Sequence, residues 1–180
     1  MKQRIIDTPL GMMMLYESQG RICRAEFVSE NQPRCSDVSS LLDEAERQIK
    51  AYFSGELTCF SLPMTLIGTE FEQDVLRTLL KIPYGQTRSY AEIARMLGRT
   101  GAARAVGRAC ARNPLLLLIP CHRVIAANGM LSGFAAGVER KLIGTSMGHT
   151  NFDTTDGYID VEQARMSDVR NAGIGYVLAH

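Results

Sequence analysis

The sequence is poor in the groups that form metal sites and disulfide frameworks. Its five cysteines include no C-x-x-C pair, and its three histidines all lie beyond residue 121. A zinc site at Cys23 and Cys35 would need one of these distant histidines, so we expect no metal and no cofactor. An odd, scattered set of cysteines is typical of a reducing compartment, and we expect a cytoplasmic protein without a disulfide framework.

Long apolar runs are absent as well. Asn113-Pro114 and Pro120 interrupt the longest apolar run of the central region, so no segment approaches the roughly 20 residues that a transmembrane helix needs. The N-terminus reaches Asp7 and Pro9 before an apolar signal core can form. We therefore expect no membrane partner. The 180 residues are 46% hydrophobic and 22% charged, which predicts a folded protein with one or two small cores.

Lysine is scarce, and the arginines that outnumber it are unevenly distributed. The chain holds sixteen arginines and four lysines and has a net charge of +1. The segment 88–140 contains eight arginines and two glutamates, a net charge of +6, which leaves −5 for the rest of the chain. A basic segment in a nearly neutral protein indicates binding to a polyanion. The alternative is a solvated helix face.

The first third of the chain predicts strands and one helix. Residues 11–16 and 22–28 flank a turn that contains glycine and predict a hairpin. Ser36-Asp37 predicts the start of a helix whose apolar residues recur at helical spacing and which ends at Gly55. A short strand is predicted over 59–66. This part shows no catalytic constellation, so we expect it to be a scaffold.

A helical region follows Gly68-Thr69-Glu70, which marks the predicted domain boundary. Residues 71–80 place their apolar side chains on one face of a helix, and Pro83-Tyr84-Gly85 ends it. The change from strand-like to helical patterns predicts a second, helical domain.

Two short helices with a glycine turn between them come next. Ser89 and Glu92 have the spacing of a capping box, which opens the first helix. A glycine turn at 98–101 leads to the second helix, predicted over 102–112 and ended before Pro114. This arrangement predicts a helix-turn-helix.

The second of these helices is unusually smooth. Most of its residues are small, and three arginines recur every four residues along one face. Such a helix fits the minor groove and phosphate contacts better than base reading in the major groove. The alternative is an alanine-rich core helix with solvated arginines. The small residues are Ala102, Ala103, Ala105, Gly107, Ala109 and Ala111, and the arginines are Arg104, Arg108 and Arg112.

Cys121 is the strongest candidate for a reactive group. The apolar run 115–118 predicts a buried strand that carries this cysteine to its end. Pro120 fixes the backbone, His122 supplies a base and Arg123 a cation, a setting that lowers a thiol pKa from its usual value of about 8.5. Neighbouring strand residues point to opposite faces, so we expect a water to connect thiol and imidazole. The alternative is an inert buried cysteine.

Several short motifs accompany this cysteine. They are Arg104-Ala105-Val106-Gly107, Asn113-Pro114, Pro120-Cys121-His122-Arg123, Asn128-Gly129 and Ser132-Gly133-Phe134. With these motifs in order and at family spacing, the chain strongly resembles the O6-alkylguanine-DNA alkyltransferases from about residue 7 to residue 141. The resemblance implies an α+β protein. An RNase-H-like α/β N-terminal domain would span 1–68, and a helical DNA-binding domain with the helix-turn-helix and the active site would span 69–141.

The resemblance also implies a reaction. Family members repair DNA by taking an alkyl group, such as methyl, from O6 of guanine onto their own cysteine, irreversibly and once per molecule. The implied partner is double-stranded DNA containing O6-alkylguanine, whose target base must leave the stack, and we expect a monomer. The alternative is a DNA-binding module that recognises alkylated guanine with little or no transfer. Retention of Cys121 argues against that module, because relatives of that kind usually lack the cysteine.

Individual residues receive roles from the same resemblance. Cys121 is the nucleophile, His122 is its base, and Tyr90 crowds the target phosphate and can donate a proton toward the departing guanine. Arg104 replaces the extruded base, and Asn113 is the hinge between the recognition helix and the active-site segment. Pro120 and Arg123 are assigned structural roles, Ala103, Ala105, Arg108 and Arg112 further DNA contacts, and Val124, Phe134 and Ala135 the alkylguanine pocket.

The chain departs from the family pattern in and after the pocket. The position at which the family carries a glutamate that orients the histidine falls on Gly148, so the relay lacks its third member and we expect slower transfer. Ala135 stands where serine is common, which removes one donor to the guanine oxygen. Residues 147–158 resemble the end of a tyrosine recombinase. We interpret 142–180 as a foreign or rearranged C-terminal tail without a second activity; a recombinase-derived fragment and a coincidental surface tail are the alternatives.

Overall fold

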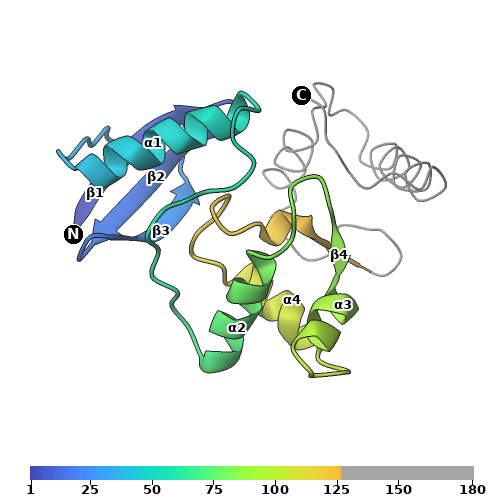
Figure 1. Ribbon diagram of the computed structural model, residues 1–180. Coiled ribbons are helices and arrows are strands. Elements are labelled where there is room, and N and C mark those ends of the chain that lie inside the picture. The colour runs from blue at the N-terminus through green and yellow to red at the C-terminus, as the bar shows by residue number, and fades with distance from the viewer. Residues whose placement is uncertain (127–180) are drawn as a thin grey trace.

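The chain forms a sheet unit and then a helical unit, as the computed structural model shows for residues 1–126, the part that it describes (Figure 1). The sheet unit contains β1 (Lys2–Thr8), β2 (Gly11–Ser18), β3 (Arg21–Phe27) and α1 (Ser40–Phe53). The helical unit contains α2 (Glu70–Leu79), β4 (Arg88–Ser89), α3 (Tyr90–Met96), α4 (Ala103–Ala111), the 3-10 turn η1 (Cys121–Arg123) and β5 (Val124–Ile125). This order of elements confirms the predicted α+β class.

The predicted hairpin is present as β2 and β3. Gln19 and Gly20 connect the two strands with positive φ angles of 52° and 69°, as a two-residue turn that follows the strand twist requires. Met13 belongs to the main core, on the side that α1 covers, whereas Met14 belongs to a smaller apolar cluster that also contains Met12. Because neighbouring strand residues point to opposite faces, β2 buries side chains on both sides of the sheet.

Strand β1 was not predicted. It pairs with β2 along its whole length in antiparallel register, from Lys2 opposite Glu17 to Thr8 opposite Gly11. The sheet order is β1-β2-β3, with α1 packed on β1 and β2. The sheet unit is therefore a meander covered by one helix, and β3 is left as an edge.

Two predictions for this unit are wrong in detail. Helix α1 does not begin at Ser36-Asp37 but at Ser40, because the Ser39 hydroxyl accepts a hydrogen bond from Leu42 N at 3.3 Å and caps the helix. The segment 59–66 is not a strand. Only Met64 forms a bridge, to Ile22 at the edge of the sheet, and the segment otherwise runs as an extended connection.

The helix-turn-helix forms as predicted. Ser89 and Glu92 cap α3 reciprocally: Ser89 N donates to Glu92 Oε2 at 2.7 Å, and Glu92 N donates to Ser89 Oγ at 3.2 Å. Gly98 and Gly101 then turn the chain with φ angles of 67° and 90°. Helix α4 packs on both α2 and α3. Within residues 1–126, no helix is both long and apolar enough to cross a bilayer.

The exposed edge of β3 joins the two units. Ile22 exchanges backbone hydrogen bonds with the extended connection that leads to α2: Ile22 N donates to Pro63 O at 2.8 Å, and Thr65 N donates to Ile22 O at 2.9 Å. Further along the same edge, Ala25 N donates to Pro114 O at 2.9 Å, and Leu116 N donates to Ala25 O at 3.0 Å. The loop that follows α4 is therefore pinned to the sheet unit.

Candidate active site

The segment before Cys121 is a folded loop, not the strand that the apolar run 115–118 predicted. Leu115 forms a single bridge to Ala25, and the next three residues turn, with Leu117 at a φ of 70°. Ile119 N donates to Leu115 O at 2.9 Å, and Cys121 N donates to Ile119 O at 2.8 Å. Local hydrogen bonds thus replace the ladder of a strand and hold Cys121, which is only 2% exposed, at the start of η1.

Asn113 organises this loop from its centre. Its Oδ1 accepts from Leu115 N at 3.0 Å, and its Nδ2 donates to Ile119 O at 3.0 Å and to Cys121 Sγ at 3.2 Å. The side chain is buried, so these bonds are shielded from water. An N–H donor at the sulfur stabilises negative charge there, which is the form of cysteine that acts as a nucleophile.

His122 follows the cysteine in the same 3-10 turn. Neighbouring residues of such a turn do not point to opposite faces as strand residues do. The expected water between thiol and imidazole rested on a strand here, so it no longer follows. The imidazole is 2% exposed, and neither ring nitrogen has a hydrogen-bond partner among residues 1–126. Burial, together with the charge of Arg123, lowers the pKa of His122 to about 3. The ring is therefore neutral at pH 7, which is the form that can accept a proton, although so low a pKa means that it holds a proton weakly.

Arg123 is held between the two units. Its Nη1 donates to Ile82 O at 2.9 Å, its Nη2 donates to the Tyr52 hydroxyl at 3.2 Å, and its guanidinium lies 5.4 Å from the centre of the Tyr84 ring. The side chain is 6% exposed. These bonds direct the cation into an aromatic cage, defined by Tyr52 and Tyr84. The sequence predicts a cation near the thiol but gives no sign of this cage.

Tyr90 is brought close to this turn by a short parallel pair of strands. Arg88 and Ser89 of β4 pair with Val124 and Ile125 of β5, so Tyr90 starts α3 immediately beside the chain that leaves η1. A Cβ on Gly107 would lie 3.7 Å from Tyr90 Cε1, so this glycine of α4 also borders the tyrosine ring. The structure thus brings the start of α3, the middle of α4 and the cysteine turn together.

The arginines of α4 differ in what they contact. Arg104 and Arg108 are exposed, whereas Arg112 Nη1 donates to Glu72 Oε1 at 2.9 Å. The other oxygen of Glu72 accepts from Thr69 N at 2.8 Å. The Thr69 backbone bond, then the Arg112 bond and the Thr69 hydroxyl, lower the pKa of Glu72 to about 2. Arg112 is therefore already paired, which the sequence analysis missed.

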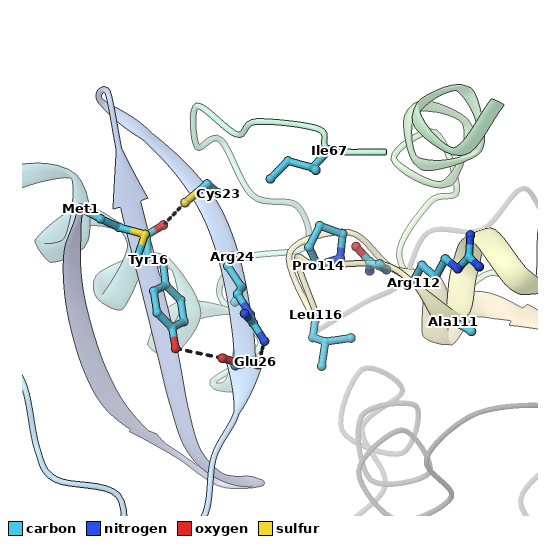
Figure 2. Close-up of a pocket in the computed structure, with 12 residues that line it drawn as sticks. Met1, Tyr16, Cys23, Arg24, Glu26, Ile67, Ala111, Arg112, Pro114 and Leu116 are labelled. Atoms are coloured by element: carbon cyan, nitrogen blue, oxygen red, sulfur yellow. Dashed lines mark hydrogen bonds and ion pairs between the residues drawn. The ribbon is translucent and has the colours of Figure 1, made fainter. Parts of the chain in front are cut away.

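A groove of about 530 Å³ lies between the sheet unit and the loop after α4 (Figure 2). On the sheet side, Glu26 accepts from the Tyr16 hydroxyl at 2.9 Å and from Arg24 Nη2 at 2.6 Å. Asn113 and Pro114 line the opposite side. This groove is not predictable from the sequence, because residues far apart in the chain form it. The charges on its sheet side already neutralise each other.

The other predicted site residues are placed as follows. Pro120 and Val124 are buried on either side of η1, and Ala103 and Ala105 are half-buried on α4. Phe134, Ala135, Gly148 and the tail 142–180 lie outside the described residues.

The fold and the site define a two-unit α+β protein: a small sheet unit, and a helical unit with a helix-turn-helix and a buried cysteine. The chain belongs to the 6-O-methylguanine DNA methyltransferases. Residues 1–66 match the ribonuclease-like domain of this family, and residues 70–143 match its DNA binding domain.

Relatives with curated names support this membership. The chain is 46% identical to the methylated-DNA–protein-cysteine methyltransferase of Mycobacterium leprae, over 77% of this chain and 87% of the relative. The constitutive protein of that name from Bacillus subtilis is 42% identical over 72% of this chain and 83% of its own.

Solved structures agree. The crystal structure of the Mycobacterium tuberculosis O6-methylguanine methyltransferase is 38% identical, with a TM-score of 0.73 over 84% of this chain and 96% of that one. A crystal structure of the M. tuberculosis protein in complex with DNA is 39% identical, with a TM-score of 0.74 over 86% of this chain and 98% of that one.

Proposed function

We propose that this protein repairs double-stranded DNA by transferring the alkyl group of O6-alkylguanine to Cys121. The observation that carries the assignment is the bond from Asn113 Nδ2 to Cys121 Sγ, which ties the end of α4 to the nucleophile. Family membership supplies the substrate class. A DNA module that binds alkylated guanine without transfer is the alternative, and a cysteine sulfur with an N–H donor favours transfer over it.

The chemistry is a displacement at an sp³ carbon. The Cys121 thiol gives its proton to the neutral His122, the sulfur forms a bond to the alkyl carbon, and the carbon–O6 bond breaks with its electron pair leaving on guanine. A proton donated toward guanine makes it a better leaving group, and in this proposal Tyr90, the first residue of α3, donates it. The product is a stable thioether, so each molecule reacts once.

The target atom cannot be reached inside a stacked duplex, so the base must be extruded at a cost of a few kcal/mol. Arg104 is exposed on α4 and takes the place of the extruded base, while the small residues Ala103 and Ala105 let the helix approach the DNA. Arg108 adds phosphate contact. The backbone carbonyls of Cys121 and Val124 face the guanine edge in this proposal, and Phe134 and Ala135 complete the pocket.

The remaining assignments concern organisation. The domains are 1–68 and 69–141, followed by the tail 142–180, and Asn113 is the hinge between α4 and the cysteine loop. The protein acts as a monomer in the cytoplasm, where its five cysteines stay reduced; they form no disulfide with one another. The absence of a glutamate at Gly148 slows the transfer.

Mass spectrometry after incubation with a duplex containing O6-methylguanine tests the function. We expect a gain of about 14 Da, the mass of one methylene, on Cys121 alone. Cys121→Ser removes the gain, whereas Cys59→Ser at an exposed site and Cys110→Ser at a buried site retain it. Methylation of the Cys121→Ser protein would contradict the assignment. Duplex binding without any gain in mass would favour the alternative module.

A further inference from the structure

The cation of Arg123 depends on a group from the other unit of the protein. Arg123 is buried, and no carboxylate within residues 1–126 forms an ion pair with it. Its described polar contacts are Ile82 O and the Tyr52 hydroxyl, supplemented by the face of the Tyr84 ring. A buried charge needs its partners, because losing one leaves a donor without either water or protein.

Tyr52 is itself fixed by the core of the sheet unit. It lies near the end of α1 and is 3% exposed. Its ring stacks on Phe60 with centroids 4.9 Å apart and planes at 30°, and it meets the edge of Tyr84 at 5.7 Å and 82°. The position of its hydroxyl is therefore set by aromatic packing, by the stack on Phe60 in the connection after α1 and by the edge contact with Tyr84 of the helical unit.

The two ends of the cysteine turn are held in different ways. Asn113 Nδ2 and the backbone bond to Ile119 hold Cys121, whereas the last residue of η1, Arg123, is held through its side chain by Ile82 O and the Tyr52 hydroxyl. A shift of the guanidinium would rotate this turn and move the sulfur. Displacements of about 1 Å at a reacting atom can lower a rate by up to about 100-fold.

We propose that Tyr52 is a positioning residue for the alkyl transfer: its hydroxyl anchors Arg123, and Arg123 orients the turn that carries Cys121 and His122. This inference rests on the proposed function, and it gives the sheet unit a part in the reaction. The sheet unit, which the sequence predicts to be a scaffold, thereby helps to position the cysteine turn.

The test compares Tyr52→Phe with Tyr16→Phe in the full chain. Tyr52→Phe removes one oxygen and keeps the ring stack. Tyr16→Phe also removes one tyrosine oxygen from the sheet unit, but that hydroxyl donates to Glu26 on the same sheet, so it is a matched control. Each variant is assayed in single turnover with free O6-benzylguanine and with a methylated duplex, at a temperature well below its melting midpoint.

We expect Tyr52→Phe to lower the maximal transfer rate roughly tenfold on both substrates, with less than a twofold change in the half-saturating duplex concentration. Each molecule should still accept one alkyl group by the end of the reaction. A purely structural defect would instead reduce the fraction of molecules that react, without changing the rate constant of those that do. Tyr16→Phe should transfer at the wild-type rate.

A second arm uses Arg123→Lys. If Tyr52 acts through Arg123, adding Tyr52→Phe to Arg123→Lys should change the rate by less than twofold. A wild-type rate in Tyr52→Phe, or full additivity of the two substitutions, would overturn the inference while leaving the proposed function intact. A wild-type protein that accepts no alkyl group from either substrate would overturn the proposed function and this inference with it.

Discussion

Asn113 Nδ2 lies 3.2 Å from Cys121 Sγ, so one side chain links the exit of α4 to the sulfur. The same amide group donates to Ile119 O, and its oxygen accepts from Leu115 N. Because α4 ends at Ala111, only Arg112 separates the helix from this contact. The helix proposed to bind DNA therefore leads, after one residue, into the hydrogen-bonded loop that carries the atom proposed to attack the alkyl group.

Asn113→Asp should slow the transfer more than Asn113→Ala. Aspartate keeps the acceptor for Leu115 N but cannot donate to Cys121 Sγ, and it places a negative charge beside a sulfur that must become negative. We expect losses of about tenfold for alanine and more for aspartate in single-turnover transfer from free O6-benzylguanine. Both variants should also lose about 1–3 kcal/mol of unfolding free energy, since buried hydrogen bonds are broken. An aspartate variant at the wild-type rate would rule out the proposed role of the amide.

Arg104 should act on the DNA and not on the reaction. It is exposed near the start of α4, away from the loop that holds the sulfur. We expect Arg104→Ala to weaken repair of a methylated duplex by at least tenfold, while transfer from free O6-benzylguanine changes by less than twofold. Arg77→Ala, on α2 and paired with Asp74, is the control and should retain both activities. Equal losses on the two substrates would contradict a role in base extrusion.

Arg108 and Arg112 should differ in their effect on the salt dependence of duplex binding. Each phosphate neutralised contributes about −0.9 to the slope of log K against log salt. Arg108→Ala should reduce the slope by about that amount. Arg112→Ala should reduce it by less, because Arg112 is already bonded to Glu72. Binding titrations of unmodified duplex at several salt concentrations measure both slopes.

The converse experiment removes the charge of Glu72, which competes with DNA phosphates for Arg112. Glu72→Gln should weaken the hold on Arg112 and so tighten duplex binding at low salt, whereas Glu70→Gln in the same first turn of α2 serves as a control for the loss of one negative charge. If both substitutions tighten binding equally, net charge and not the Arg112 bond explains the effect.

The elements that the sequence predicted well are those whose signals are local. Ser89 and Glu92 cap α3 because a capping box is completed within four residues, and the glycine turn before α4 follows from residues that tolerate positive φ. Family motifs around Cys121 indicated the family, and the chain belongs to it; the roles of Cys121 and its neighbours remain predictions.

The parts that failed depend on contacts between distant residues. An apolar run such as 115–118 has no property that separates a buried strand from a buried loop; here the Asn113 side chain takes the backbone groups that a neighbouring strand would have bonded. In the same way, nothing near Arg123 in the sequence indicates Tyr52, which is 71 residues away. The aromatic cage and the pairing of Arg112 with Glu72 could be found only in three dimensions.

His122 should make the protein less stable as the pH falls below neutrality. Burial lowers its pKa in the folded protein to about 3, from the ordinary histidine value of 6.5, so the unfolded chain binds the proton first. The stability is therefore complete above pH 6.5 and is lost as the pH falls from 6.5 toward 3, by roughly 1.4 kcal/mol for each unit. Between pH 7 and pH 5 we expect a loss of about 2 kcal/mol from this group.

Urea unfolding at intervals of half a pH unit measures this loss, with His122→Gln as the variant that cannot take up the proton. The variant should show a loss smaller by that amount over the same interval, whatever its stability at pH 7. Parallel curves for the two proteins would show that burial does not hold the imidazole neutral in the folded protein.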